Sequence, residues 1–195
     1  MAEIEISNHE ELEELKRRSF SRRVALITAI YAVLLAITSL GGNNAAKEMM
    51  LAQQQSSDQW AFYQSKVMRE HLYLLEEKRT KAVLSERGPT MSLAGRAEYE
   101  ALAHWSEKEA GRYAVEKKEI EKKSTELEKE RDISKSKDPY FDFAEALLQI
   151  AIVLASIAIL ADSVLVFWIS AVSAVAGSVL MINGYLLIFT LPFLK

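Results

Sequence analysis

Three polar side chains lie where an apolar segment begins, and their spacing places them on one face of a helix. They are Asp142, Glu145 and Gln149, at positions i, i+3 and i+7. Carboxylates at the edge of a bilayer are costly and usually face protein or water. In a ring of subunits, this set would form an acidic vestibule that attracts cations. The alternative is that Asp142 and Glu145 simply reach the lipid headgroups.

A second polar group could hold a metal if the chain folds back on itself. His71 and His104 would then lie about one helical turn apart, with Glu70 and Glu107 nearby. Their spacing matches no metal-binding motif, so two unrelated interfacial histidines is the simpler interpretation. The chain also lacks cysteine, a phosphate loop, an HExxH and a dinucleotide fingerprint. We therefore predict a protein that is not an enzyme and has no metal site, cofactor or catalytic residue.

Hydrophobic and charged residues are segregated along the 195-residue chain, which is typical of a membrane protein. The apolar residues form three runs, at 24–40, 143–161 and 164–189. Each run is about long enough to cross a bilayer core. Only Asp162 and Ser163 separate the last two, which predicts a tight transmembrane hairpin. The net charge of -3 is too small to suggest nucleic acid as a partner.

Small side chains line the third run at spacings that allow another helix to approach closely. We expect them to pack helices within the transmembrane hairpin or between subunits, and assign to an oligomer interface Ser170, Ala174, Gly177 and Ser178. Asp162 is expected to be a solvated turn residue and the N-cap of the third span. A proton relay is the alternative role for this aspartate.

The polar middle of the chain predicts an antiparallel helical hairpin. Residues 43–87 contain neither proline nor glycine, and residues 92–137 are similarly rich in strong helix formers. Gly88 and Pro89 lie midway between them, where a left-handed glycine followed by proline would end the first helix. Each arm would then be about 65 Å long.

The ends of the two arms carry further signals. Thr90 or Ser92 can cap the second arm. We expect the glycine pair at 41–42 to end the first span and Pro139 to end the second arm before the next span.

Aromatic residues in the middle of the chain point to a contact between subunits. Folding about Pro89 places Trp60 near Ile120, and a heptad seam is expected on Ala46, Trp60, Val67 and Leu74, opposite Tyr113, Ile120 and Leu127. One seam cannot also bury Phe62 and Tyr63. We therefore predict that Trp60, Phe62 and Tyr63 contact a partner, most simply another copy of the chain.

The orientation in the membrane is predicted from flanking charge. Five basic residues at 16–23 precede the first run, so the positive-inside rule places the N-terminus in the cytoplasm and the hairpin in the periplasm. The lysine-rich segment at 122–137 is a contrary signal, although long loops follow the rule poorly. A cleaved signal peptide is the alternative to a first span. The long segment before it and the helix-forming sequence after it favour a span.

Two stretches of the chain are similar to a known family. The sequences NNAAKE, at 43–48, and SSDQWAFYQSKVMREHLYLLE, at 56–76, resemble a family of small bacterial membrane proteins known only as a domain of unknown function. The resemblance runs from about Arg22 to the last span. It implies a bacterial membrane location, with one span before and two spans after a helical middle. It implies no activity, cofactor or catalytic residue.

These patterns together predict an all-α integral membrane protein with three transmembrane helices and a long extramembrane helical hairpin. The expected segments are a cytoplasmic part with a short helix at 1–23, a span at 24–41, the hairpin at 42–140 with its tip at 88–90, and spans at 141–161 and 164–190. The expected function is an oligomeric coiled-coil scaffold, spacer or accessory subunit in the bacterial inner membrane. The alternative is an oligomeric ion-conducting or transport-related protein. Expected partners are membrane lipids and further copies of the chain, and an unidentified protein could bind the hairpin tip.

Overall fold

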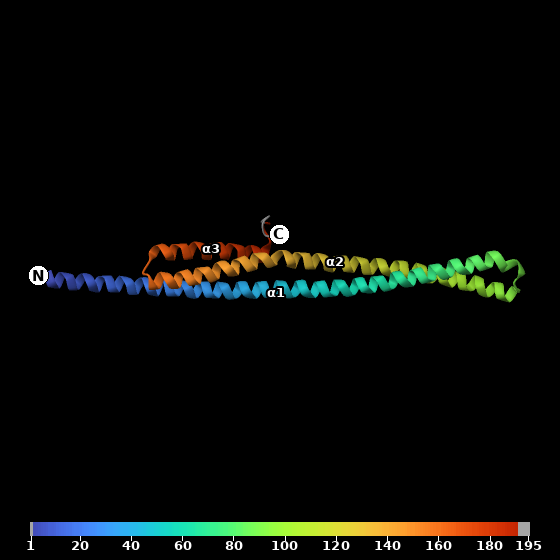
Figure 1. Cartoon of the computed structure of the whole chain (residues 1–195), viewed down its shortest axis with the longest axis horizontal. Coiled ribbons are helices and arrows are strands. Elements are labelled where there is room, and N and C mark those ends of the chain that lie inside the picture. The colour runs from blue at the N-terminus through green and yellow to red at the C-terminus, as the bar shows by residue number, and fades with distance from the viewer. Residues whose placement is uncertain (1, 191–195) are drawn as a thin grey trace. The chain divides into compact units, whose positions relative to one another are not determined.

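The computed structural model describes the backbone of residues 2–190 and the side chains of residues 14–190, and this part of the chain is all α-helical apart from turns. Figure 1 shows the order of the elements: helix α1 at Ala2–Arg87, the short 3-10 turn η1 at Gly88–Thr90, helix α2 at Leu93–Leu160 and helix α3 at Val164–Leu186. The predicted all-α fold class is confirmed. By length and composition, three helices are long and apolar enough to cross a membrane.

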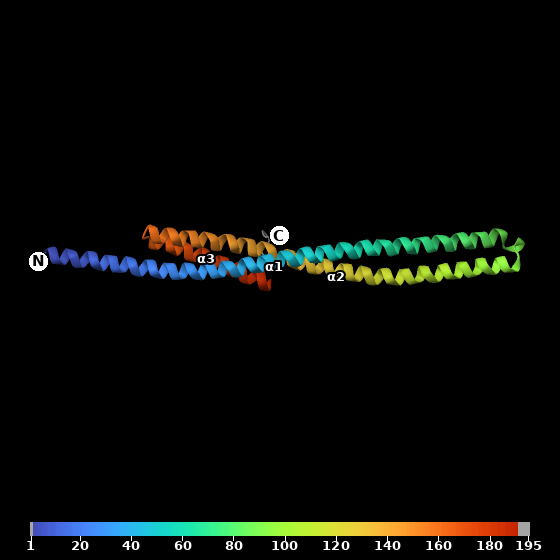
Figure 2. The ribbon, with the colours of Figure 1, turned by 90° about the horizontal axis from the view of Figure 1, so that it is seen from below.

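The chain divides into two compact units. The three-helix unit comprises Met1–Met49 and Asp132–Lys195, and the hairpin unit comprises Met50–Arg131. In both ribbon views α1 and α2 lie side by side within each unit (Figures 1 and 2). The short N-terminal helix expected within residues 1–23 is the beginning of α1, which is helical from Ala2.

Two expected helix ends are absent from the described helices. Gly41 and Gly42 lie inside α1, and Pro139 lies inside α2. Pro139 removes one backbone bond, to the carbonyl of Lys135, which is an exposed residue. Directly after the proline, Tyr140 and Phe141 are buried. Packing of these side chains therefore offsets the lost hydrogen bond, and the helix continues.

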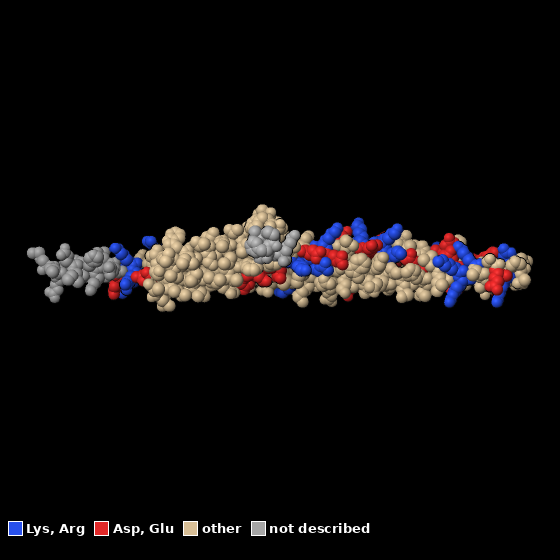
Figure 3. Space-filling model, turned by 45° about the horizontal axis from the view of Figure 1, so that its top comes forward, with Lys and Arg blue, Asp and Glu red and all other residues tan. Residues whose placement is uncertain are grey.

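The core of the three-helix unit is built from small and β-branched side chains around a few large ones. Buried together are Val24 and Tyr31 of α1, Leu148, Ala151 and Ala155 of α2, and Ala174 of α3. The opposite faces of these helices expose apolar side chains, among them Leu26, Ile30 and Val33 of α1, Ile150 and Val153 of α2, and Leu165, Val172 and Val175 of α3. On the face that Figure 3 shows, uncharged side chains cover the middle of this unit and charged ones lie at its ends, whereas charged side chains gather over the hairpin unit.

The seam of the hairpin unit is formed mainly by small side chains. Buried along it are Ala52, Ser56 and Thr80 of α1, and Ala103, Ser106, Ala110, Tyr113, Ile120 and Ser124 of α2. The expected positions Trp60, Val67 and Leu74 are only half-buried. The residues of α1 that face α2 come one position earlier in the sequence than these three. Small side chains at the seam let the two helices approach closely, and the large ones flank it.

The turn of the hairpin lies at the expected residues but has different backbone geometry. No glycine of the described residues has a positive φ, so Gly88 is not the predicted left-handed cap. The chain instead turns through η1, where the Thr90 hydroxyl donates to the carbonyl of Arg87 at 2.9 Å. Ser92 then caps α2, since its Oγ accepts the backbone N–H of Gly95 at 3.1 Å.

Candidate functional site

The predicted vestibule residues do share one face of α2. Asp142 and Gln149 are exposed, Glu145 is half-buried, and the Gln149 amide donates to Glu145 Oε1 at 3.2 Å. Just before this face, burial raises the pKa of Asp138, and the nearby charge of Asp142 adds to that effect. The set faces outward from the chain that carries it, so one copy encloses no vestibule.

Small residues of α3 are used within the chain. The Ser170 hydroxyl donates to the carbonyl of Ala151 at 2.7 Å, and the Ser173 hydroxyl donates to that of Leu147 at 2.8 Å. A Cβ atom at Gly177 would lie 3.1 Å from the side chain of Leu148. These contacts fit the predicted packing within the transmembrane hairpin.

The same contacts leave little of this stripe for another subunit. Ser170, Ala174 and Gly177 are buried against α2, and half-buried Ser178 bonds to a carbonyl of its own helix, that of Ala174. The expectation that these residues form an oligomer interface is corrected for the three buried ones, because α2 of the same chain already covers them.

Hydroxyl groups connect all three helices of this unit. Tyr31 of α1 has a side-chain hydrogen bond with Ser170 of α3, which in turn donates to Ala151 of α2. Near the other end of α3, the Tyr185 hydroxyl donates to the carbonyl of Ile37 at 3.1 Å. These links were not predicted from the sequence, because single hydroxyl groups in an apolar run give no pattern.

The turn between α2 and α3 meets the basic N-terminal segment. Arg17 Nε lies 3.0 Å from Asp162 Oδ2, and Asp162 has a left-handed backbone with φ of 49°. The N-cap of α3 is Ser163, whose Oγ accepts the backbone N–H of Val166 at 3.5 Å. The prediction of Asp162 as the N-cap is therefore wrong, because its backbone makes the turn and its carboxylate pairs with Arg17.

Ion pairs lie in the seam of the hairpin unit. Lys66 Nζ is 2.6 Å from Glu116 Oε2, and Lys117 Nζ is 2.5 Å from Glu70 Oε2. The side chains of Lys66 and Glu70 are only 15% and 12% exposed. The hydrogen bond from Lys66 lowers the pKa of Glu116, and the bond to Glu70 raises the pKa of Lys117. These pairs connect the two arms where apolar core residues were expected.

The aromatic cluster divides between the seam and the surface. The Trp60 indole donates to Glu128 Oε1 at 2.9 Å and makes an edge contact with Tyr63, with ring centroids 5.3 Å apart. Both rings are half-buried, whereas Phe62 is 50% exposed. The Trp60 indole therefore reaches a side chain about two helical turns beyond the predicted neighbour, Ile120. Of the three residues predicted to contact a partner, Phe62 is the most accessible.

Nearer the tip, the predicted pairing is close to the observed one. Tyr73 makes an edge contact with Trp105, with centroids 5.2 Å apart, and stacks on Tyr113 with centroids 5.6 Å apart. Folding the chain about Pro89 places Trp105 beside Leu74, which is the residue next to Tyr73.

A row of exposed side chains runs along α1 in the hairpin unit. We call it the outer stripe, and its members are Ala61, Ser65, Met68, Leu72 and Leu75. Met68, Leu72 and Leu75 are 62%, 58% and 49% exposed. The spacings alternate between four and three residues, so the stripe is a second heptad seam on a helix whose first seam packs against α2. The outer stripe was not predicted from the sequence, because the neighbouring aromatic residues dominate the pattern of apolar side chains.

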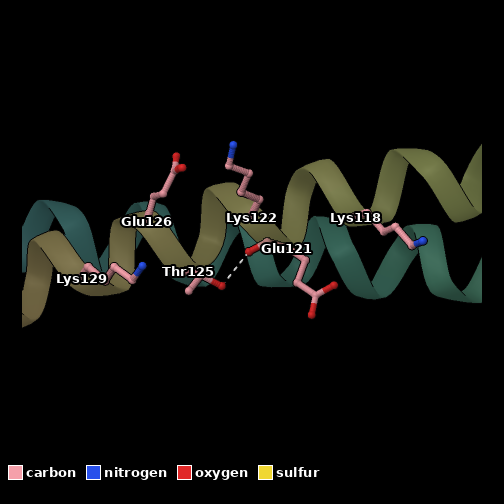
Figure 4. A pocket seen from close by; sticks show the side chains of 6 residues that line it. All are labelled: Lys118, Glu121, Lys122, Thr125, Glu126 and Lys129. Atoms are coloured by element: carbon pink, nitrogen blue, oxygen red, sulfur yellow. Dashed lines mark hydrogen bonds between the residues drawn. The ribbon is translucent and has the colours of Figure 1, made fainter.

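An open pocket of about 400 Å³ lies along α2. Figure 4 shows the six side chains that line it. Its lining comes from successive turns of one helix face: Lys118, Glu121, Lys122, Thr125, Glu126 and Lys129. The Thr125 hydroxyl donates to the backbone carbonyl of Glu121 at 2.9 Å. Alternating charges without enclosing walls are typical of a solvated helix surface. Within the described residues, no group of three or more His, Asp or Glu side chains could hold a metal ion.

Comparison with known proteins gives one family. The model of a family described as a domain of unknown function, DUF4337, matches residues 20–187, which confirms the resemblance found from the sequence. No curated protein and no solved structure matches the chain.

Proposed function

The chain belongs to the DUF4337 family of domains of unknown function, and we propose that it is a membrane-anchored, oligomeric coiled-coil scaffold or accessory subunit without catalytic activity. The observation that carries this proposal is the outer stripe. A charged helical hairpin that presents a second apolar seam is suited to binding another helix.

The three-helix unit supplies the proposed anchor. Its exposed side chains are apolar on all three helices, including Leu26, Ile150 and Leu165. A unit in water rarely exposes so large a continuous apolar surface, whereas lipid tails would cover it without cost. Tyr31, Ser170 and Ser173 keep their hydroxyl groups bonded inside the unit, as a membrane requires.

We place the anchor in the bacterial inner membrane, with the N-terminus in the cytoplasm and the hairpin unit in the periplasm. The five basic residues at 16–23 favour this orientation. The Arg17–Asp162 pair supports a path of three spans, because such a path returns the α2–α3 turn to the side on which the first span begins.

Mass measurement tests the scaffold. We expect native mass spectrometry of the full chain, extracted into lipid nanodiscs, to give more than one copy per particle. Planar bilayers containing the same protein should show no conductance above that of the lipid alone. A single copy per nanodisc at every protein-to-lipid ratio would contradict the proposal.

The second candidate function is ion conduction by the oligomer. It is favoured by the outward position of Asp142, Glu145 and Gln149, since carboxylates at a bilayer edge need polar cover that one copy does not supply. If the protein carries a cation-selective current and the Glu145→Gln variant does not, ion conduction would replace the scaffold as the proposed function. Current that is unchanged in Glu145→Gln would not support a vestibule at these residues.

A protein partner at the hairpin tip is compatible with the scaffold. Leu93, the first residue of α2, is 90% exposed beside the turn. We propose that a partner of the scaffold covers this side chain. Crosslinking in cells tests this contact by comparing the proteins recovered with the unchanged chain and with a Leu93→Ser variant. Recovery of the same proteins with both would argue against a tip contact.

A further inference from the structure

We propose that two copies of the chain pack in parallel through their outer stripes, an inference that rests on the oligomeric scaffold proposed above. The stripe is exposed although its spacing is that of a coiled-coil core. Its occupant should therefore be a helix with the same repeat, and another copy of α1 supplies one.

The position of the outer stripe on α1 leaves room for a second copy of the chain. α2 occupies the seam that contains Ala52, Ser56 and Thr80 of α1. The outer stripe occupies the heptad rows on the side of α1 that faces away from that seam. A second copy can therefore approach Met68 and Leu72 without displacing α2.

The polar side chains beside the outer stripe set the relative direction of the two α1 helices. In a parallel pair, each residue on one flank of the stripe faces the residue five positions later on the second copy. His71 therefore lies beside Glu76 of the second copy, and Gln64 lies beside Arg69 of the second copy. In an antiparallel pair, Arg69 would lie beside Arg69 of the second copy, and like charges repel. Arg69 also donates to the Tyr113 hydroxyl of its own hairpin at 3.5 Å. Neither His71 nor Glu76 has an ion-pair partner within the described residues. Charge complementarity therefore favours the parallel arrangement.

The contact between the two outer stripes is short. Asp58 and Arg79 bound the apolar part of the stripe, which leaves about two heptads. So short a coiled coil is weak between freely diffusing helices. Two chains in one membrane have parallel α1 helices and a high effective concentration, so membrane anchoring makes a short contact sufficient.

Cysteine crosslinking in membranes tests the contact, because the chain has no natural cysteine. In a parallel pair, Ala61 faces its own counterpart at a distance that a disulfide can bridge. Ala61→Cys in the full chain should therefore form a covalent dimer on oxidation. The matched control is Val115→Cys, an exposed position on α2 that should give little dimer.

An antiparallel pair has a distinct result. It would separate the two copies of residue 61 by more than about 25 Å and bring Ala61 opposite Arg79. Crosslinking between Ala61→Cys chains and Arg79→Cys chains, without crosslinking among Ala61→Cys chains alone, would overturn the parallel arrangement.

A charge variant tests whether the stripe itself makes the contact. Met68→Lys with Leu72→Lys, added to Ala61→Cys, should lower the crosslinked fraction about tenfold, with helix content unchanged because both side chains are exposed. An undiminished dimer would overturn the inference.

The mass measurement separates the two proposals. If the unaltered protein has several copies per nanodisc but Ala61→Cys does not crosslink, only the outer-stripe contact is overturned and the scaffold stands. If the protein is a single copy, both proposals fail together.

Discussion

At Gly41, a Cβ atom would lie 2.6 Å from a ring carbon of Phe141 and 2.6 Å from the Tyr185 hydroxyl. We therefore expect Gly41→Ala to destabilise the three-helix unit by about 1–3 kcal/mol, as overpacking does. Thermal unfolding of the detergent-solubilised protein, followed by circular dichroism, measures this change.

Gly111 provides the matched control, because a Cβ atom there would meet nothing within 4 Å. Gly111→Ala should stabilise its helix by up to about 1 kcal/mol. Equal unfolding temperatures for the two variants would show that the close approach of the aromatic rings is unimportant.

Glu116 should make the stability of the hairpin unit depend on pH. Its pKa is lowered by the hydrogen bond from Lys66, so its contribution to stability is complete above the ordinary glutamate pKa and is lost as pH falls through the lowered value. We expect the unfolding temperature of the hairpin to fall below about pH 4. The fall should be smaller in Glu116→Gln, which has no carboxylate to protonate. Identical pH profiles for the two proteins would contradict this role.

Residues of the seam show what a sequence can and cannot give at this scale. Lys66 and Glu70 lie on the same heptad rows as Ala52 and Ser56. The small residues of these rows were the sequence signal from which the seam could have been predicted. Charged side chains normally indicate a solvated surface, so only the cross-arm partners Glu116 and Lys117 explain their burial.

Among the elements, α2 depends on a local cap at its beginning. Ser92 Oγ satisfies the backbone N–H of Gly95, so Ser92→Ala should cost about 1 kcal/mol. Hydrogen exchange should then accelerate in the first turn of α2. Thr90→Ala is the control, because the Thr90 hydroxyl donates to a carbonyl and satisfies no helix N–H. Equal acceleration in both variants would mean that Ser92 has no special capping role.

The elements themselves were largely predictable, and their ends were not. Three apolar runs and a Gly-Pro pair were sufficient to predict helices that include the candidate spans and a turn at 88–90. The glycines at 41–42 and Pro139 were misinterpreted as helix ends. Local preference was outweighed by packing, since Phe141 lies against Gly41 and is itself buried.

For the whole molecule, orientation in the membrane is the prediction most open to test. A membrane-impermeant maleimide applied to intact cells should label Ser85→Cys, beside the hairpin turn, and should not label Ser7→Cys until the cells are lysed. The reason is the basic segment at 16–23, which favours the cytoplasm. The reverse labelling pattern would place the hairpin unit in the cytoplasm.

The hydroxyl links between the three helices have a consequence for biosynthesis. The Tyr185 hydroxyl bonds to the carbonyl of Ile37, a residue 148 positions earlier, and the partner of Tyr31 is Ser170 on the same late helix. While the ribosome is still translating the hairpin, α1 has none of these partners. In the membrane-anchored protein proposed above, the Tyr31 hydroxyl therefore has no α3 partner until Ser170 has been synthesised, and α3 completes the unit.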